Sequence, residues 1–430
     1  MKKKLKSGIN LLIVLTVVAV MQGIIYKRNA VFRRIYDVMK YDIQNYKYDE
    51  ISDGVPADRE TVYEERRRVI TDGCRKINKT VSTSFAIENQ NIVSSIDHMI
   101  YYCPITKIGS TFWKRVLTVM GSHGKYLSPF EISLRQVKLL KVKDFSETEL
   151  KTLKETGTSF MFARDPYARL FSGYENKIYH ANLMYWKAIG RQVVRVVRKS
   201  YDDVYKNFGF DATFPEFIKY ILYLSESKKN IDIHFTPMVK SCDPCLTHFQ
   251  YIGKIETFKD DADFLISKWQ NQFENITIRI GDFEKESILD TAKGRINSLF
   301  DTKKILNEIK FPFVNIMLRT WRDLQIRGYI SKHIEFPFKH TNVSEITKED
   351  YTEAVKVALN ATVDHAAVKQ QREEALIQSY SQVPLEDMER LRHYVLKDCL
   401  LFGYDDRPKK LFDRSKPLDG GFLYLDGLKK

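Results

Sequence analysis

The chain of 430 residues lacks several signatures that would place it in a common class. It has no Gly-x₄-Gly-Lys-Ser/Thr loop and no protein-kinase signature, which argues against an ordinary nucleotide-dependent kinase. The sequence Cys242-Asp243-Pro244-Cys245 is followed by no second cysteine pair and no His-x₃₋₅-His, so we expect neither zinc nor any other metal. Internal repeats and low-complexity tracts are also missing, which favours an ordinary globular body.

Acidic residues are absent from residues 1–34, which carry eight Lys or Arg and therefore supply +8 of the net charge of +14. The rest of the chain is only +6, so the charge gives little support to nucleic-acid binding, and we expect no nucleic-acid partner. A hydrophobic content of 43% and an aromatic content of 13% predict a folded protein with an ample core.

An uncharged, mostly apolar run of 17 residues, Ile9–Ile25, follows four lysines near the N-terminus. Its length is at the lower limit for crossing a bilayer and suits the thinner membranes of the early secretory pathway. We therefore predict a cytosolic tail at 1–8, a transmembrane signal anchor at 9–25, a stem at 26–95 and a lumenal domain at 96–430. A cleaved signal peptide is the alternative, but the run is long for one and no Ala-x-Ala-like site follows it.

Two further patterns agree with a lumenal body. Acceptor tripeptides for N-glycosylation occur at four positions: Asn78, Asn275, Asn342 and Asn360. In an oxidising compartment we expect a local disulfide between Cys242 and Cys245. Because five cysteines are an odd number, at least one of the others stays free or pairs between two chains, which would make a homodimer; these are Cys74, Cys103 and Cys399.

Short apolar runs alternate with helical patterns from residue 96 onward, which predicts an α/β fold with a central, mainly parallel sheet flanked by helices. The expected strands are Met99–Tyr102, Thr158–Ala163, Tyr251–Ile255 and Ile276–Ile280. The expected helices are Thr111–Met120, Pro166–Tyr179, a segment capped by Thr213 and Glu216 and running through Leu224, Phe258–Trp269, and Leu385–Leu401. A charged helical stretch near Arg59–Ile70 falls within the expected stem.

The first of two strand–turn–helix segments carries a lysine and two hydroxyl residues at its turn. There the strand leads into Lys107-Ile108-Gly109-Ser110-Thr111. Gly109 would let the backbone approach an anion closely, while Ser110 and Thr111 would add hydroxyl donors at a helix N-terminus. Lys107 would add a point charge. Taken alone, an ordinary glycine turn capped by Ser and Thr is the alternative interpretation.

The second segment makes an anion site more convincing. Arg164 ends a strand, Asp165 can cap the following helix, and Ser172 lies on the helical face of Arg169. Arginine binds phosphate oxygens bidentately, so Arg164 and Ser172 can form a phosphate clamp. A structural pair between Asp165 and Arg169 is compatible with this. Two such sites on one sheet suit 3′-phosphoadenosine 5′-phosphosulfate (PAPS), which has two separate anionic groups.

Together the two segments resemble the 5′-phosphosulfate loop and the 3′-phosphate site of Golgi carbohydrate sulfotransferases. The resemblance is closest to the branch that 4-O-sulfates N-acetylgalactosamine in chondroitin, dermatan and related glycans. It continues through Asp232–Pro237, Cys242–Cys245, Tyr251–Thr257 and Leu401–Tyr404, and so covers roughly residues 98–405.

The resemblance implies a PAPS-dependent sulfotransferase, a type II Golgi membrane protein with a lumenal catalytic domain. Its acceptor would be a glycosaminoglycan or a glycoprotein glycan. Lys107 would be the cofactor-activating lysine. The rest of the phosphosulfate loop would be Ile108, Gly109, Ser110, Thr111, Phe112, Trp113, Lys114 and Arg115, and the 3′-phosphate site would comprise Arg164, Asp165 and Ser172.

The chain departs from the family pattern at four positions. Ser110 replaces the usual Cys, Phe112 the usual Asn, Phe235 the usual Trp, and Cys399 a usual aromatic residue. Ser110 keeps the size of cysteine and adds a donor, so cofactor binding should survive. Phe112 removes a polar side chain beside the loop and leaves the acceptor preference open.

Sulfuryl transfer also needs a base for the attacking hydroxyl. His234 is the first candidate, because a neutral imidazole accepts a proton readily, and Glu256 is the second. A lone histidine is more often structural. A catalytically silent glycan-binding protein on the same scaffold is the alternative function, although the presence of Lys107, Arg164 and Ser172 argues against it.

Three arginines occur at helical spacing further along the chain: Arg191, Arg195 and Arg198. They form either a solvated helix face or a basic wall that contacts a polyanionic glycan.

Overall fold

The computed structural model describes residues 58–79, 91–95, 100–200, 208–273, 276–309, 311–339, 345–415 and 421–426. They belong to a compact unit that begins at Asp58. The expected anchor at 9–25 lies outside the described residues. Among the helices that are described, none combines the length and the apolar character needed to cross a membrane.

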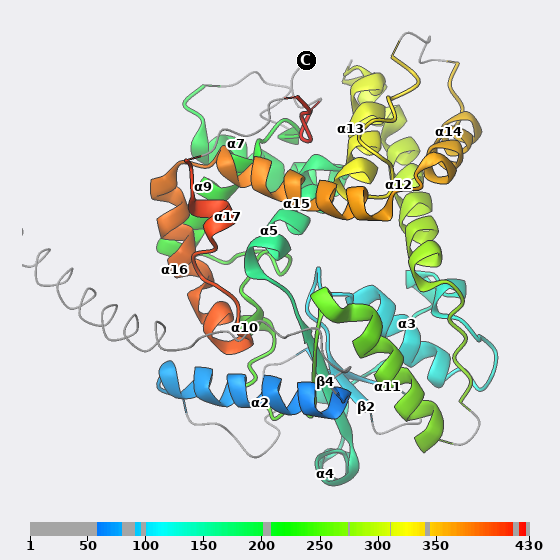
Figure 1. Ribbon diagram of the computed structural model, residues 1–430, viewed down its shortest axis with the longest axis vertical. Helices are drawn as coiled ribbons and strands as arrows, with labels where there is room; N and C mark the ends of the chain where they lie inside the picture. Colours follow the sequence, from blue (N-terminus) through cyan, green and yellow to red (C-terminus); the bar gives the residue numbers. More distant parts are fainter. Residues whose placement is uncertain are drawn as a thin grey trace, which may run out of the picture. The chain divides into compact units, whose positions relative to one another are not determined.

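A five-stranded sheet in the order β3-β1-β2-β4-β5 forms the centre of the lower half in Figure 1. The strands are β1 (Val93–Ser94), β2 (Ile100–Cys103), β3 (Leu140–Lys141), β4 (Thr158–Ala163) and β5 (Tyr251–Lys254). β2, β4 and β5 are parallel, whereas β1 pairs antiparallel with both β2 and β3. The expected α/β class and the three parallel strands are confirmed. β2 and β4 are buried along almost their whole length, as strands covered on both faces must be.

The expected strand at Ile276–Ile280 is wrong. Ile278 donates its N–H to the side chain of Gln270, and Arg279 donates its N–H to the carbonyl of Leu127. The alternating isoleucines of this segment pack against the sheet core without joining a ladder. The alternation of apolar and polar residues shows that one face of this segment is buried. A strand also needs a neighbouring strand to pair with, which this pattern does not predict.

Helices make up most of the remaining structure. The α-helices are α2 (Arg59–Lys76), α3 (Ser110–Met120), α4 (Glu147–Thr156), α5 (Pro166–Tyr174), α6 (Leu183–Tyr185), α7 (Arg191–Val197), α9 (Phe214–Glu226), α10 (Met238–Ser241), α11 (Phe258–Gln272), α12 (Phe283–Glu308), α13 (Phe313–Ile326), α14 (Lys348–Ala361), α15 (His365–Ser381), α16 (Leu385–Phe402) and α17 (Lys409–Phe412). Short 3₁₀ turns are η1 (Pro129–Glu131), η2 (Leu134–Gln136), η3 (Val142–Asp144) and η6 (Ile255–Thr257), and two π-helical turns are η4 (Glu175–Tyr179) and η5 (Trp186–Gly190). Figure 1 shows α5, α9, α13 and α15 gathered beyond the carboxyl end of β4.

Helix α2 belongs to the folded body, although we expected this stretch in a stem ending at residue 95. Arg66 of α2 makes a buried ion pair with Asp261 of α11, 2.9 Å apart, and donates to the carbonyl of Ile252 in β5 at the same distance. α2 also crosses α16 closely, because a Cβ at Gly73 would lie 2.6 Å from the carbonyl oxygen of Leu400. The body therefore begins at Asp58, and β1 is part of its sheet.

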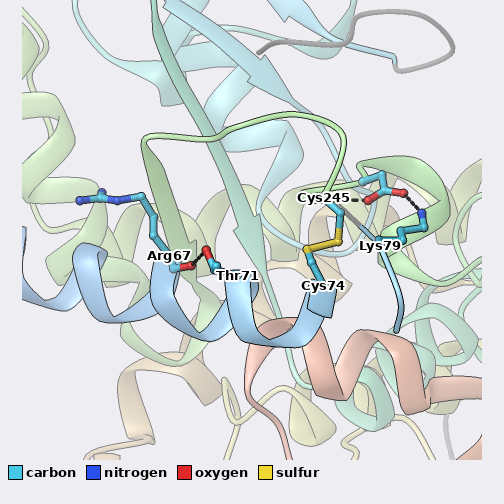
Figure 2. Close-up of a disulfide and its surroundings, with 6 residues drawn as sticks. Arg67, Thr71, Cys74, Lys79 and Cys245 are labelled. Atoms are coloured by element: carbon cyan, nitrogen blue, oxygen red, sulfur yellow. Dashed lines mark hydrogen bonds and ion pairs between the residues drawn. A yellow bond between two sulfur atoms is a disulfide. The ribbon is translucent and has the colours of Figure 1, made fainter. Parts of the chain in front are cut away.

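The disulfides differ from the expected local bridge. Cys74 of α2 is bonded to Cys245, as Figure 2 shows, and Cys103 at the end of β2 is bonded to Cys242. The two cysteines of the Cys-x-x-Cys turn are therefore held by two different segments rather than by each other. Cys399 is free and buried, in agreement with the odd cysteine count.

Candidate active site

The turn after β2 presents an uncapped helix N-terminus. Lys107 and Gly109 both have positive φ, 68° and 67°, so the chain doubles back just before α3 begins. Gly109 is the N-cap residue and offers no capping side chain, and the first turn of α3 holds no acidic residue. The leading N–H groups of α3 are thus left for an outside anion, and the helix dipole favours one. A Cβ at Gly109 would also lie 2.7 Å from the ring of Phe258. Glycine is therefore favoured here both by the positive φ and by the lack of space for a side chain.

The turn after β4 lies on the adjacent parallel strand. Asp165 caps α5 by accepting the N–H of Ala168 at 2.7 Å, and Pro166 occupies the first turn, as expected. Arg164 donates to the backbone carbonyl of Lys107 at 3.1 Å, so it links the two turns directly. Ser172 is buried two turns into the same helix. The alternative, a structural pair between Asp165 and Arg169, does not form, because Arg169 donates to backbone carbonyls instead.

Arg169 ties three segments into one site. Its buried guanidinium donates to the carbonyl of Thr106 before the Lys107 turn, at 3.1 Å. It also donates to the carbonyls of Ile233 and Thr236, at 3.2 and 2.7 Å. The hydroxyl of Thr106 donates to Ile233 as well, at 2.8 Å. The loop that carries His234 is therefore fixed beside the loop that carries Lys107.

His234 is held by a carboxylate. Its Nδ1 lies 2.7 Å from Oδ1 of Asp232, whose same oxygen accepts the backbone N–H of His234 at 2.9 Å. The hydroxyl of Tyr185 lies 3.0 Å from the same ring nitrogen. An Nδ1–H that donates to a carboxylate leaves Nε2 as the proton acceptor. Burial lowers the pKa of His234, and Lys177 and Lys107 lower it further, whereas Asp232 opposes the shift.

A buried cluster of charges lies behind Lys107. Glu175 on η4 binds Arg295 of α12 at 2.8 Å and Arg327, just after α13, at 2.6 Å, and Arg295 also pairs with Asp323. Burial would raise the pKa of Glu175, but Arg327 and Arg295 outweigh it and hold the pKa below its usual value. Burial raises the pKa of the neighbouring Asp323. Glu175 therefore stays ionised among cations.

Lys107 is half-buried among these charges. Removal from water lowers its pKa well below the ordinary value, and Glu175 opposes this effect. The nearby guanidinium groups of Arg327, Arg295 and Arg164 lower the pKa further. A bound anion would stabilise the charged form of Lys107, because its negative charge offsets the repulsion from the neighbouring cations.

Glu256, the second candidate base, lies at the other turn. One carboxylate oxygen accepts the backbone N–H of Asp165 at 3.0 Å, and the other accepts the hydroxyl of Tyr404 at 2.9 Å. Both oxygens are thus already hydrogen-bonded, and one of them supports the start of α5. His234, by contrast, is near enough to Lys107 to feel its charge. The geometry favours His234 over Glu256 as the base.

Comparison of the sequence with known proteins agrees with this geometry. Residues 90–318 match the profile described as "Sulfotransferase family", which covers more than half of the chain. The chain belongs to the sulfotransferase family. The resemblance found in the motifs is confirmed, although the matched region ends before α14.

The curated relatives that this chain matches include carbohydrate sulfotransferases. Carbohydrate sulfotransferase 11 of Rattus norvegicus is 28% identical over 215 residues, covering 48% of this chain and 61% of the relative. Carbohydrate sulfotransferases 8 and 9 of Homo sapiens are 30% and 31% identical, and each alignment covers just under half of both chains. The alignments thus span about half to three fifths of the relatives' length. No solved structure matches the chain.

The residues expected to form the phosphosulfate loop divide into two groups. Lys107, Gly109, Ser110, Thr111 and Lys114 are partly or fully exposed near the turn, and burial lowers the pKa of Lys114. The side chains of the remaining members point into the body; these are Ile108, Phe112, Trp113 and Arg115.

Trp113 corrects one expectation. Its indole has no exposed surface and lies between aromatic rings of the sheet core, 5.0 Å from both Phe160 and Phe162. It can support the loop from behind, but it has no surface left for a cofactor. Arg115 similarly pairs with Asp290 of α12 at 2.8 Å.

The arginines of α7 do not form one basic wall. Arg198 ends the helix and pairs with Asp211 and with Glu216, at 2.6 Å in each case. Glu216 also belongs to the capping box that begins α9 at Thr213, as expected. Arg198 is therefore structural, whereas Arg195 is exposed.

Several residues that lie beside the candidate site were not predicted from the sequence. Asp232 stands two residues before His234, a spacing that could have suggested a carboxylate–imidazole pair. Tyr185, Arg295 and Arg327 reach the site from distant elements, and no local pattern marks them. Among the described residues, no group of three or more His, Cys, Asp or Glu side chains is arranged to hold a metal ion.

Proposed function

We propose that this protein transfers a sulfuryl group from PAPS to a hydroxyl of a glycan. The observation that carries the proposal is the link between Arg164 and the carbonyl of Lys107, which joins two anion-binding turns on adjacent parallel strands. One turn would hold the 5′-phosphosulfate and the other would hold the 3′-phosphate. Anionic ligands of open parallel sheets bind at this carboxyl edge.

In this proposal, Lys107 acts on the leaving group. Sulfuryl transfer, like phosphoryl transfer, should have a loose in-line transition state in which charge builds up on the leaving oxygen. The ammonium of Lys107 and the first N–H groups of α3 would stabilise that charge. The bond from sulfur to the phosphate oxygen breaks as the bond to the glycan oxygen forms, and 3′-phosphoadenosine 5′-phosphate (PAP) leaves.

His234 would take the proton of the attacking hydroxyl on Nε2. Asp232 would hold the ring in the required tautomer and stabilise the imidazolium that forms, as in other carboxylate–imidazole pairs. Arg169 would keep this loop in register with Lys107, because it binds the carbonyls on both sides. Glu256 would support the start of α5 and take no part in proton transfer.

The acceptor that we propose is N-acetylgalactosamine in chondroitin, dermatan or a related glycan, sulfated at the 4-position. This finer proposal rests on the motif resemblance and on the likeness to carbohydrate sulfotransferases 8, 9 and 11.

We also propose a single-pass Golgi protein with residues 1–8 in the cytosol, an anchor at 9–25 and a lumenal body. The two long-range disulfides support an oxidising compartment. Asn78 and Asn360 are exposed, as glycosylation acceptors must be, whereas Asn275 and Asn342 lie outside the described residues.

Thermal unfolding in the presence of nucleotides tests the cofactor proposal. PAP should raise the unfolding temperature and ATP at the same concentration should not, because only PAP carries a 3′-phosphate. Transfer of label from radiolabelled PAPS to desulfated chondroitin then tests the reaction. Protection by PAP without any transfer would favour a catalytically silent glycan-binding protein.

A further inference from the structure

Lys177 is a half-buried cation beside the proposed base. It lies on the π-helical turn η4, and its ammonium is 4.1 Å from the ring centre of Tyr185. The ring of Tyr185 meets His234 edge to face, with centroids 5.3 Å apart. Lys177, Tyr185 and His234 therefore form one continuous row, which we call the lysine–tyrosine row. π-Helical turns occur frequently at functional sites.

Within the part of the chain that the structure describes, no carboxylate forms an ion pair with Lys177. The acid that most affects it, Asp232, is already bound to His234. Burial lowers the pKa of Lys177, and Arg295 lowers it further. A cation kept partly out of water without a carboxylate on it is costly, unless an anion arrives with a ligand.

Exposed apolar side chains lie next to this row in sequence. Ile233 is 61% exposed although its carbonyl is bound by Thr106 and Arg169, and Met184, which precedes Tyr185, is 68% exposed. Sugar rings present C–H faces together with polar edges, so a site for them combines apolar surface with a few fixed polar groups. A cation, an aromatic ring and apolar side chains beside a base are therefore suited to an acidic sugar.

We infer that the lysine–tyrosine row is the acceptor subsite and that Lys177 binds an anionic group of the acceptor glycan. The group is a uronate carboxylate or a sulfate ester on the sugar next to the one whose hydroxyl reaches His234. This inference rests on the proposed sulfuryl transfer and specifies which acceptors it uses. Lys177 contacts the substrate, whereas Tyr185 positions both Lys177 and His234.

The test compares charged and neutral forms of the same acceptor. Desulfated chondroitin and its carboxyl-reduced form differ only in the uronate, and a neutral N-acetylgalactosamine glycan and its 6-sulfated form differ only in a sulfate ester. Lys177→Met should raise KM for at least one charged acceptor about ten- to a hundredfold, which is the range of a charge-assisted hydrogen bond. It should leave KM for the matching neutral acceptor and the affinity for PAP unchanged. The pair of acceptors in which KM for the charged member rises identifies the anionic group that Lys177 binds.

Lys187→Met is the matched control, because Lys187 also lies over an aromatic ring, that of Phe208 at 5.3 Å, but is exposed. Lys187→Met should leave KM for every acceptor and the affinity for PAP unchanged. Lys177→Arg should keep the preference for the charged acceptor. Equal effects of Lys177→Met on charged and neutral acceptors, or weaker PAP binding, would overturn the inference. If the wild type transfers label to none of the acceptors, the proposed function itself fails. If it uses the neutral forms as well as the charged ones, only the subsite inference is wrong.

Discussion

The guanidinium of Arg164 donates to the carbonyl oxygen of Lys107 at 3.1 Å, which joins the two ends of the proposed cofactor site. The residue expected to bind the 3′-phosphate thus also fixes the loop of the residue expected to act on the leaving group. Arg164 and Ser172, although both are assigned to the 3′-phosphate site, should therefore differ when they are mutated.

Ser172→Ala should weaken PAP binding about tenfold, with little effect on adenosine 5′-phosphosulfate, which lacks the 3′-phosphate. Arg164→Ala should weaken PAP binding more strongly and also reduce kcat, because the Lys107 loop loses a bond. Calorimetric titration with both ligands and steady-state kinetics measure these effects. Equal losses of both ligands in Ser172→Ala would mean that Ser172 is structural.

PAP binding should be accompanied by proton uptake at Lys107. In the free protein, burial and three arginines hold the pKa of Lys107 well below its usual value, and a bound phosphate would raise that pKa again. Affinity should be full below the free-state pKa and fall as the pH rises through it toward the pKa of the complex. Titration in two buffers of different ionisation enthalpy measures the protons taken up. Lys107→Met should abolish that buffer dependence, and its persistence would contradict this assignment.

The acidic limb of the pH–rate profile should lie below pH 6.5, since the base must be neutral and burial and nearby lysines lower the pKa of His234. His234→Asn should cut kcat strongly, leave PAP affinity near normal and remove the limb. Asp232→Asn should lower kcat less and move the limb to lower pH, because the carboxylate that supports the imidazolium is gone. A dead Glu256→Gln enzyme beside an active His234→Asn enzyme would reverse the assignment of the base.

The disulfide between Cys74 and Cys245 should stabilise the body, because it closes a loop between two residues that are 171 positions apart in the sequence. Cys74→Ser together with Cys245→Ser should cost about 2–5 kcal/mol in the free energy of unfolding, measured with denaturant. Unreduced protein in denaturant should react with one equivalent of a thiol reagent, at Cys399. Three reactive thiols would show that one of the two bridges is absent.

Local signals predicted the elements that carry the cofactor turns. β4 has the expected bounds, and Asp165 with Pro166 begins α5 because a capping carboxylate and a fixed φ act within one turn of chain. The disulfide partners and the cluster around Glu175 could not be predicted in this way, since they depend on segments far apart in sequence. The stem was placed wrongly because the charged surface of α2 conceals a single buried face anchored by Tyr63 and Cys74.

The most direct test of the central claim is the rate of sulfuryl transfer by Lys107→Met. With radiolabelled PAPS and desulfated chondroitin, turnover should fall about 10²- to 10³-fold, because the ammonium acts mainly on charge that develops in the transition state. Lys143→Met, which removes an exposed lysine outside the site, should keep the wild-type rate. A Lys107→Met protein that folds, binds PAP and transfers sulfate at a near-normal kcat would contradict the account.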